Sequence, residues 1–134
     1  MDETHVVTCF VEHDGRVLVL KRSGEVGSYQ ERWAGVSGYI EPTHTPLQQA
    51  WEELGEEVGL DESDVVLVRE GLPLEVMDGQ LKKKWVVHPF RFHLGEVKKI
   101  RTDWEHKDYR WIRPQEIKLL STVPRLLEAW ENVK

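Results

Sequence analysis

Residues 38–60, GYIEPTHTPLQQAWEELGEEVGL, constrain this chain more than any other part of it. Thr45 is predicted as a helix N-cap, with Pro46 at the first helical position and Gln48 completing a capping box. Gly59 fits the left-handed residue that ends a helix. Apolar residues between these marks recur at helical spacing. The segment therefore predicts an amphipathic helix with a buried apolar stripe.

The same helix is predicted to place Glu53, Glu56 and Glu57 on one face, because they lie at i, i+3 and i+4. No Lys or Arg occurs from Trp33 to Val68, whereas eight acidic residues do. Like charges at this spacing cost about 0.2–0.5 kcal/mol per pair, and the last turn of a helix disfavours anions further. The arrangement indicates a hard divalent cation such as Mg²⁺. A solvated acidic face is the alternative.

The stretch resembles the Nudix box of the Nudix hydrolase superfamily, whose pattern is G-x5-E-x7-R-E-U-x-E-E-x-G-U, with U an aliphatic residue. Seven of the nine defined positions fit without a gap. The pattern has Glu where this chain has His44, and Arg where it has Glu52.

The resemblance implies an enzyme, a Nudix pyrophosphohydrolase acting on phosphorus-containing acid anhydrides, that hydrolyses a nucleoside diphosphate linked to another group X. It implies Mg²⁺ or Mn²⁺ as cofactor, with Glu53, Glu56 and Glu57 as catalytic metal ligands and Gly38 placing backbone near the metal or phosphate. Glu53 is our first choice for a base or metal ligand within the box. Glu105, in a later loop, is the best candidate for a general base outside it, and an ordinary surface acid is the alternative.

The two departures have a physical interpretation. In the family, the first Glu and the Arg brace the loop against the helix. His44 and Glu52 could keep that brace with reversed polarity, which requires a proton on His44, whose ordinary pKa is about 6.5. Non-additive effects of mutating both would show the coupling. The alternatives are drift in a box with little activity, and His44 as a ligand to a softer ion. The first of these makes the chain a catalytically weak nucleotide-binding or sensing module.

Residues before the box are candidates for substrate binding. Tyr29, Arg32 and Trp33 could stack on a base or contact phosphate, although Trp33 could equally belong to the core. His106, beside the candidate base, is expected to be a solvated loop residue. Nothing in the sequence fixes X or the cleaved bond.

The remaining pattern predicts an α+β fold. Strands are expected over 4–12, 16–21, 65–69, 72–76, 82–94 and 108–112, with a hairpin turn at Asp14-Gly15. Pro89 predicts an edge position or a bulge in its strand. A helical turn is expected over 114–118 and a helix over 123–133, with Pro124 in its first turn. A mixed sheet between two helical layers matches the Nudix α/β/α sandwich that the resemblance implies, as a single domain over residues 1–134.

Composition narrows the function classes. The net charge of −6 argues against a nucleic-acid-coating role, and a small nucleotide is the expected partner. We see no signal peptide and no apolar run long enough for a membrane. A lone Cys9 suits a reducing cytosol, so a cytoplasmic protein is expected. The oligomeric state is open, a homodimer included. The runs RWAGVSGYIE, WVVHPFRF and TVPRLLEAW look like the Nudix domain that some archaeal proteins fuse to a translation initiation factor 2B-like domain.

Overall fold

One mixed β-sheet forms the centre of the protein. The computed structural model describes residues 2–96 and 100–134. In chain order, its strands are β1 Asp2–His13, β2 Arg16–Arg22, β3 Trp33–Ala34, β4 Val36–Tyr39, β5 Val65–Glu70, β6 Leu74–Asp78, β7 Lys83–Leu94 and β8 His106–Ile112. The helical elements are α1 Pro46–Glu53, which continues as a π-helical turn Leu54–Val58, a 3-10 helix Pro114–Leu119 and α2 Leu126–Glu131.

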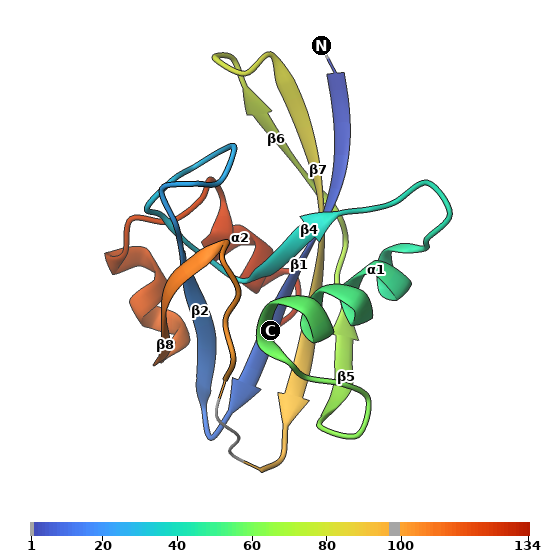
Figure 1. The fold of residues 1–134 in the computed structure, drawn as a ribbon, viewed down its shortest axis with the longest axis vertical. Coiled ribbons are helices and arrows are strands. Elements are labelled where there is room, and N and C mark those ends of the chain that lie inside the picture. The colour runs from blue at the N-terminus through green and yellow to red at the C-terminus, as the bar shows by residue number, and fades with distance from the viewer. Residues whose placement is uncertain (1, 97–99) are drawn as a thin grey trace.

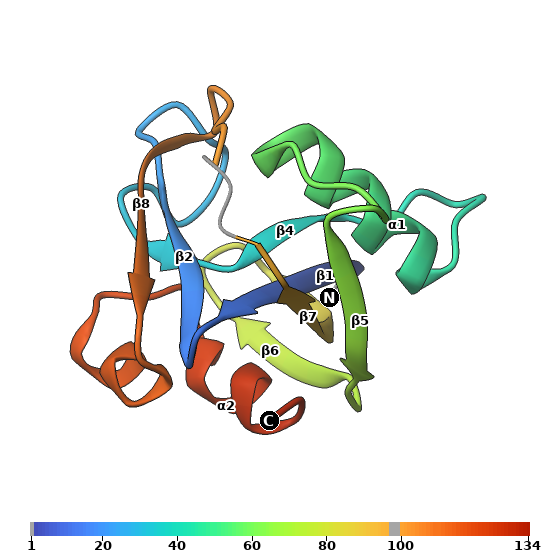
Figure 2. The same ribbon diagram turned by 90° about the horizontal axis from the view of Figure 1, so that it is seen from below.

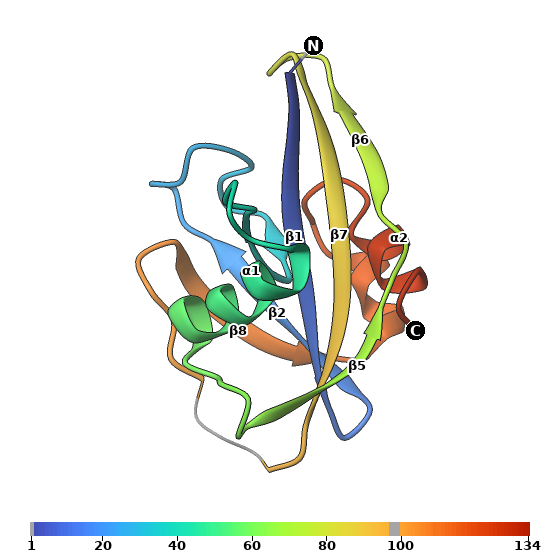
Figure 3. The ribbon, with the colours of Figure 1, turned by 90° about the vertical axis from the view of Figure 1, so that its right-hand side faces the viewer.

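The sheet has the order β3-β2-β1-β7-β5, with β4 also paired to β1, β6 to β7 and β8 to β2. The two long central strands, β1 and β7, run parallel, and the other pairs named here are antiparallel (Figure 1). Viewed from below or from the side, α1 and α2 lie on opposite sides of β1 and β7 (Figures 2 and 3). The predicted mixed sheet between helical layers is therefore confirmed.

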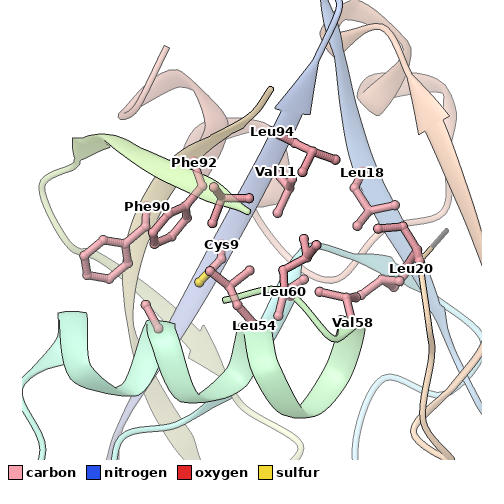
Figure 4. Close-up of a cluster of buried hydrophobic side chains, with 14 of the residues drawn as sticks. Cys9, Val11, Leu18, Leu20, Leu54, Val58, Leu60, Phe90, Phe92 and Leu94 are labelled. Carbon is pink, nitrogen blue, oxygen red and sulfur yellow. The ribbon is translucent and has the colours of Figure 1, made fainter. Parts of the chain in front are cut away.

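Two apolar clusters hold the helical layers to the sheet. The first lies beneath α1 and its π-helical turn and includes Cys9, Val11, Leu54, Val58 and Phe90 (Figure 4). The second lies on the α2 side and includes Phe10, Trp33, Trp85, Leu126 and Trp130. Successive residues of β1 therefore enter opposite clusters, because side chains alternate along a strand. The central residues of β1, 7–11, are accordingly buried on both faces of the sheet.

The predicted hairpin between β1 and β2 is confirmed. Asp14 and Gly15 both have positive φ, 50° and 75°. A two-residue hairpin loop of type I′ needs positive φ at both positions, which Asp-Gly adopts readily.

Pro89 corrects one expectation. Its strand β7 is neither an edge nor bulged at this residue, since it pairs continuously with β1, where Pro89 lies opposite Thr8. On its other side, β5 ends opposite Phe90 and β6 begins opposite Val87. Pro89 lies between the segments of β7 that pair with β5 and with β6. The backbone N–H that proline lacks is therefore not needed for an antiparallel hydrogen bond.

The C-terminal helix is shorter than predicted. Pro124 lies outside α2, because Arg125 adopts a left-handed conformation with φ of 60° immediately before it. The Arg125 guanidinium donates a hydrogen bond of 2.6 Å to the Glu75 carbonyl, which fixes this turn against β6. None of the helices in the described part is long and apolar enough to cross a membrane.

Candidate metal and substrate site

The start of α1 is set by the predicted capping box. The Gln48 N–H donates to the Thr45 hydroxyl at 3.1 Å, and the Thr45 N–H donates to the Gln48 side chain at 2.8 Å. With Pro46 at the first position, these bonds fix where the helix begins.

The last turn of this helical segment is π-helical rather than α-helical, which the sequence did not predict. It spans Leu54–Val58 and ends at Gly59, whose φ of 71° is left-handed as expected. Single π-helical turns are frequent at functional sites. Here the turn carries Glu56 to the surface and Glu57 into the interior.

Glu53 is a buried carboxylate held between two neighbours. On one side the Gln49 amide donates a hydrogen bond of 2.9 Å to its Oε1. On the other side lies Gly38 of β4, where an added Cβ would be only 2.2 Å from the Glu53 carboxyl carbon. Glycine at this position is therefore what lets the carboxylate reach the strand.

Glu57 is the most unusual group of the site. It is 1% exposed, and neither carboxylate oxygen has a hydrogen-bond partner. The His106 Nε2 lies 3.3 Å from Oε1, but this contact lacks hydrogen-bond geometry. Burial, followed by the neighbouring Glu53, raises the pKa of Glu57 well above its ordinary value. A buried carboxylate without a partner is costly unless it takes a proton or a cation.

Glu56 and Glu105 face the same cavity as Glu53. Partial desolvation by the surrounding protein raises the pKa of Glu56, although the residue is exposed, and the charge of Glu53 adds to the rise. Burial also raises the pKa of Glu105, with further contributions from Asp103 and Glu53, while Arg22 opposes them. The structure thus brings Glu105, predicted from a distant loop, to the acidic residues of the helix.

His44 and Glu52 are in contact, as the brace hypothesis requires. The His44 Nδ1 lies 3.2 Å from the Glu52 carboxylate, and its Nε2 lies 3.7 Å from that of Glu41. A hydrogen bond with Gln49 is the main cause that raises the pKa of His44, and Glu41 and Glu52 add to it against the effect of burial. Whether the pair stabilises the box stays a prediction.

Among residues 2–96 and 100–134, only Glu41, His44 and Glu52 bring three candidate ligand atoms within 4.8 Å of one another. Their mutual contacts, with a histidine inclined to hold its proton, account for this grouping without an ion. Glu53, Glu56 and Glu57 do not meet this criterion as a group of three, although Glu53 is close enough to raise the pKa of Glu57.

A cavity of about 500 Å³ adjoins these carboxylates, within the range of small-molecule sites. One part of its wall is acidic and carries Glu53, Glu56 and Glu105. Apolar and aromatic side chains form much of the rest, including Val6, Tyr29, Tyr39, Val76, Trp85, Val87, Trp104 and Leu126. The cavity can therefore accept a ligand that has both a charged and an apolar, planar part.

Of the three predicted substrate residues, only Tyr29 lines the cavity. Arg32 is exposed and donates to the Thr122 carbonyl at 3.2 Å. Trp33 is a core residue, 6% exposed, with Arg110 placed 4.8 Å from its ring centre. The core alternative for Trp33 therefore holds, because its neighbours fill the space around the ring.

Tyr29 and Trp85 form an aromatic corner of the cavity, with ring centres 6.2 Å apart. The Tyr29 hydroxyl donates to Asp78 at 2.6 Å, and burial together with Asp78 raises its pKa to about 12. The indole N–H of Trp85 opposes this rise, yet it meets no acceptor at hydrogen-bond geometry and is a buried, unsatisfied donor.

Sequence reasoning missed Trp85, Gln49 and the burial of His106. Trp85 and Val87 are two residues apart in β7 and therefore share one face of the sheet, so the face of Trp85 could have been inferred. Gln49 precedes Glu53 by one helical turn, a spacing at which side chains meet. The expectation for His106 is wrong, since it opens β8 opposite Arg22 and is buried. Only the strand pairing, which brings distant residues together, reveals this.

Comparisons with known proteins agree with this geometry. A family model described as NUDIX domain matches residues 2–131. The nucleoside triphosphatase NudI of Salmonella agona (strain SL483) is 23% identical over 124 residues, which cover 89% of this chain and 88% of that protein. Among solved structures, the MutT protein from Methanosarcina mazei Go1 superposes with a TM-score of 0.82 at 20% identity, over 97% of this chain and 91% of that one. A C. elegans Ap4A hydrolase does so with 0.78 at 14% identity, over 98% and 94%.

Proposed function

Since the chain belongs to the Nudix family, whose model matches residues 2–131, we propose that it is a divalent-metal-dependent hydrolase that cleaves the pyrophosphate linkage of a nucleoside diphosphate bound to a group X. Relatives named as a nucleoside triphosphatase and an Ap4A hydrolase support a nucleotide substrate. Their names differ, so they do not fix X.

The observation that carries the proposal is that the Glu57 carboxylate, beside Glu53, is buried without a hydrogen-bond partner. Carboxylate oxygens are the donors that Mg²⁺ and Mn²⁺ prefer. Glu53, Glu56 and Glu57 would hold the ion, and Gly38 keeps the space next to Glu53 clear of any side chain. When bound, a divalent ion neutralises pyrophosphate charge and lowers the pKa of a water molecule.

Glu105 is our candidate for the proton acceptor. It stands in the cavity wall with Glu53 and Glu56, but it belongs to the loop before β8 rather than to the helix. Its raised pKa brings it towards the operating range of a general base. In this arrangement the helix carboxylates would bind the ion, and Glu105 would take a proton from the attacking water.

The aromatic corner would hold the nucleoside part of the substrate. Tyr29 and Trp85 offer ring faces, and the unsatisfied indole N–H offers a donor to an acceptor atom on a base. Trp104, which is 64% exposed at the cavity rim, can close over a bound ring.

A nucleotide-binding or sensing module with little turnover is the second candidate. The observation that favours it is the replacement of the family's Glu and Arg by His44 and Glu52. A module of this kind would keep the nucleotide-binding cavity but hydrolyse its ligand at a low rate.

A nucleotide panel separates the two candidates. Nucleoside triphosphates, dinucleoside polyphosphates and nucleotide sugars are incubated with Mg²⁺ or Mn²⁺, and release of phosphate or monophosphate is measured. We expect turnover of at least one class, and a loss of about 100-fold or more in Glu53→Gln. Glu62→Gln, an exposed acid in the turn after the box, is the control and should keep full activity. Binding of a non-hydrolysable analogue in titration calorimetry without any turnover would favour the module.

Four narrower expectations accompany the proposal. We propose that residues 1–134 form a single domain and that the protein is cytoplasmic. A homodimer is one of the possible oligomeric states. We also propose that the domain resembles the Nudix domain that some archaeal proteins fuse to an initiation factor 2B-like domain. The reduced Cys9 in the core supports the second of these.

A further inference from the structure

Gln49 is a buried polar side chain whose amide group is fully engaged. It is 2% exposed. Its Oε1 accepts the Glu41 N–H at 3.1 Å and a hydrogen bond from the His44 Nδ1 at 2.7 Å. Its Nε2 donates to the Glu53 carboxylate at 2.9 Å.

These contacts settle which way the amide faces. The Glu41 N–H can only donate, so the atom that it meets must be the Gln49 oxygen. The nitrogen then faces Glu53, where a carboxylate can only accept. A flipped amide would place its NH2 group against the Glu41 N–H, donor to donor, and its oxygen against the Glu53 carboxylate, acceptor to acceptor.

The opposite side of the Glu53 carboxylate is closed as well. Gly38 lies so close that any side chain at that position would overlap the carboxylate. Gln49 and Gly38 therefore confine Glu53 from two sides, and His44 and the Glu41 backbone in turn confine Gln49.

We propose that Gln49 is a positioning residue for the divalent-ion site, which holds the Glu53 carboxylate by a neutral hydrogen bond. This inference rests on the proposed function. A neutral donor suits the role, because an Arg or Lys at this place would cancel the charge that must attract the ion. In this chain, the residue that the family pattern reserves for Arg is Glu52, which contacts His44. Gln49 supplies the donor from the preceding turn of the helix.

A purely structural role for Gln49 would affect folding and leave ion affinity alone, so the test measures both. Residues that orient a metal ligand typically account for 10- to 100-fold in metal affinity. We expect Gln49→Met, which keeps the length and removes the donor, to weaken Mn²⁺ binding by about 10- to 100-fold in the substrate-free protein. Calorimetry or the electron paramagnetic resonance signal of free Mn²⁺ measures this.

Gln48→Met is the matched control. Gln48 is the neighbouring glutamine of the same helix, and it bonds to the Thr45 backbone rather than to Glu53. Its loss should lower thermal stability through the cap and leave Mn²⁺ affinity within about twofold of the wild type. If Gln49→Met does not fold, Gln49→Asn, which keeps a neutral amide but is one methylene shorter and withdraws the donor from Glu53, is measured instead. In a Glu53→Gln background, replacing Gln49 should add less than about twofold, because the two residues act as a unit.

Unchanged Mn²⁺ affinity in the Gln49 variant, together with a loss in Glu53→Gln, would overturn this inference and leave the proposed function standing. If the wild type does not bind Mn²⁺ and Glu53→Gln makes no difference, the proposed function itself fails.

Discussion

Glu53 is held by neighbours that do not compensate its charge. The contact with Gly38 can be tested by adding a single methyl group to that glycine. In Gly38→Ala the new Cβ would overlap the carboxylate, so the flexible Glu53 side chain must move away from β4. We expect Mn²⁺ affinity to fall by about 10-fold or more. The free energy of unfolding should change by no more than about 1 kcal/mol, since Ala is tolerated in a strand.

Gly79→Ala is the control for Gly38→Ala, because an added Cβ at Gly79 meets nothing within 4 Å. It should leave Mn²⁺ binding unchanged. Wild-type affinity in Gly38→Ala would show that the position of the Glu53 carboxylate does not matter for the ion.

We expect the Glu57 carboxylate to lower the stability of the ion-free protein, a cost that serves its proposed function as a metal ligand. Its pKa in the folded protein is raised above the ordinary value of 4.5, so the folded state binds the proton more tightly than the unfolded state. The free energy of unfolding therefore falls as pH rises through the window between those two pKa values. Without divalent ions, Glu57→Gln should raise the free energy of unfolding near about pH 8 by about 1–3 kcal/mol and flatten this pH dependence. Urea unfolding in a chelator measures both effects.

At that pH His106 does not compensate the charge of Glu57. Burial is the main cause that lowers the pKa of His106, so its imidazole stays neutral. Glu56→Gln, at an exposed position of the same turn, provides the comparison and should change stability by less than about 0.5 kcal/mol. A Glu57→Gln protein that is less stable than the wild type in chelator would mean that the carboxylate already has a partner.

At the scale of the element, the helical segment must stop at Gly59 for its last turn to hold the carboxylates. Gly59 has a φ of 71°, and an added Cβ would approach the Arg101 guanidinium at 3.3 Å. Gly59→Ala should lower the free energy of unfolding by about 1–2 kcal/mol, the cost of the left-handed conformation for a residue with a Cβ. Urea unfolding again provides the measurement.

Gly55→Ala is the counterpart within the same turn. Gly55 has ordinary φ and its nearest neighbour is 3.9 Å from an added Cβ, so alanine should be neutral or stabilising by up to about 1 kcal/mol. Equal effects of the two substitutions would contradict the idea that the left-handed residue sets the end of the helix.

Elements were predictable where their signals are local. The capping box at Thr45, the Asp14-Gly15 turn and the stop at Gly59 depend on neighbours in sequence, and the structure has all three. The π-helical turn was missed because its sequence is compatible with an ordinary α-helix. Pro89 was misjudged because only the arrangement of β5 and β6 shows that no antiparallel ladder bond is lost there.

For the whole molecule, the sandwich and the acidic box were predictable from pattern and resemblance, and the surroundings of the box were not. Glu105 reaches the helix carboxylates, and His106 closes over Glu57, because β8 pairs with β2 across the sheet. Arg32 and Trp33 precede the box in sequence but do not line the cavity. Closeness along the chain was a poor guide to closeness in the site.

The most direct test of the account is the anomalous signal of Mn²⁺ in crystals grown or soaked with that ion. We predict a peak whose oxygen ligands include Glu53, Glu56 and Glu57. A peak confined to the cluster of Glu41, His44 and Glu52, or no peak at saturating Mn²⁺, would contradict it.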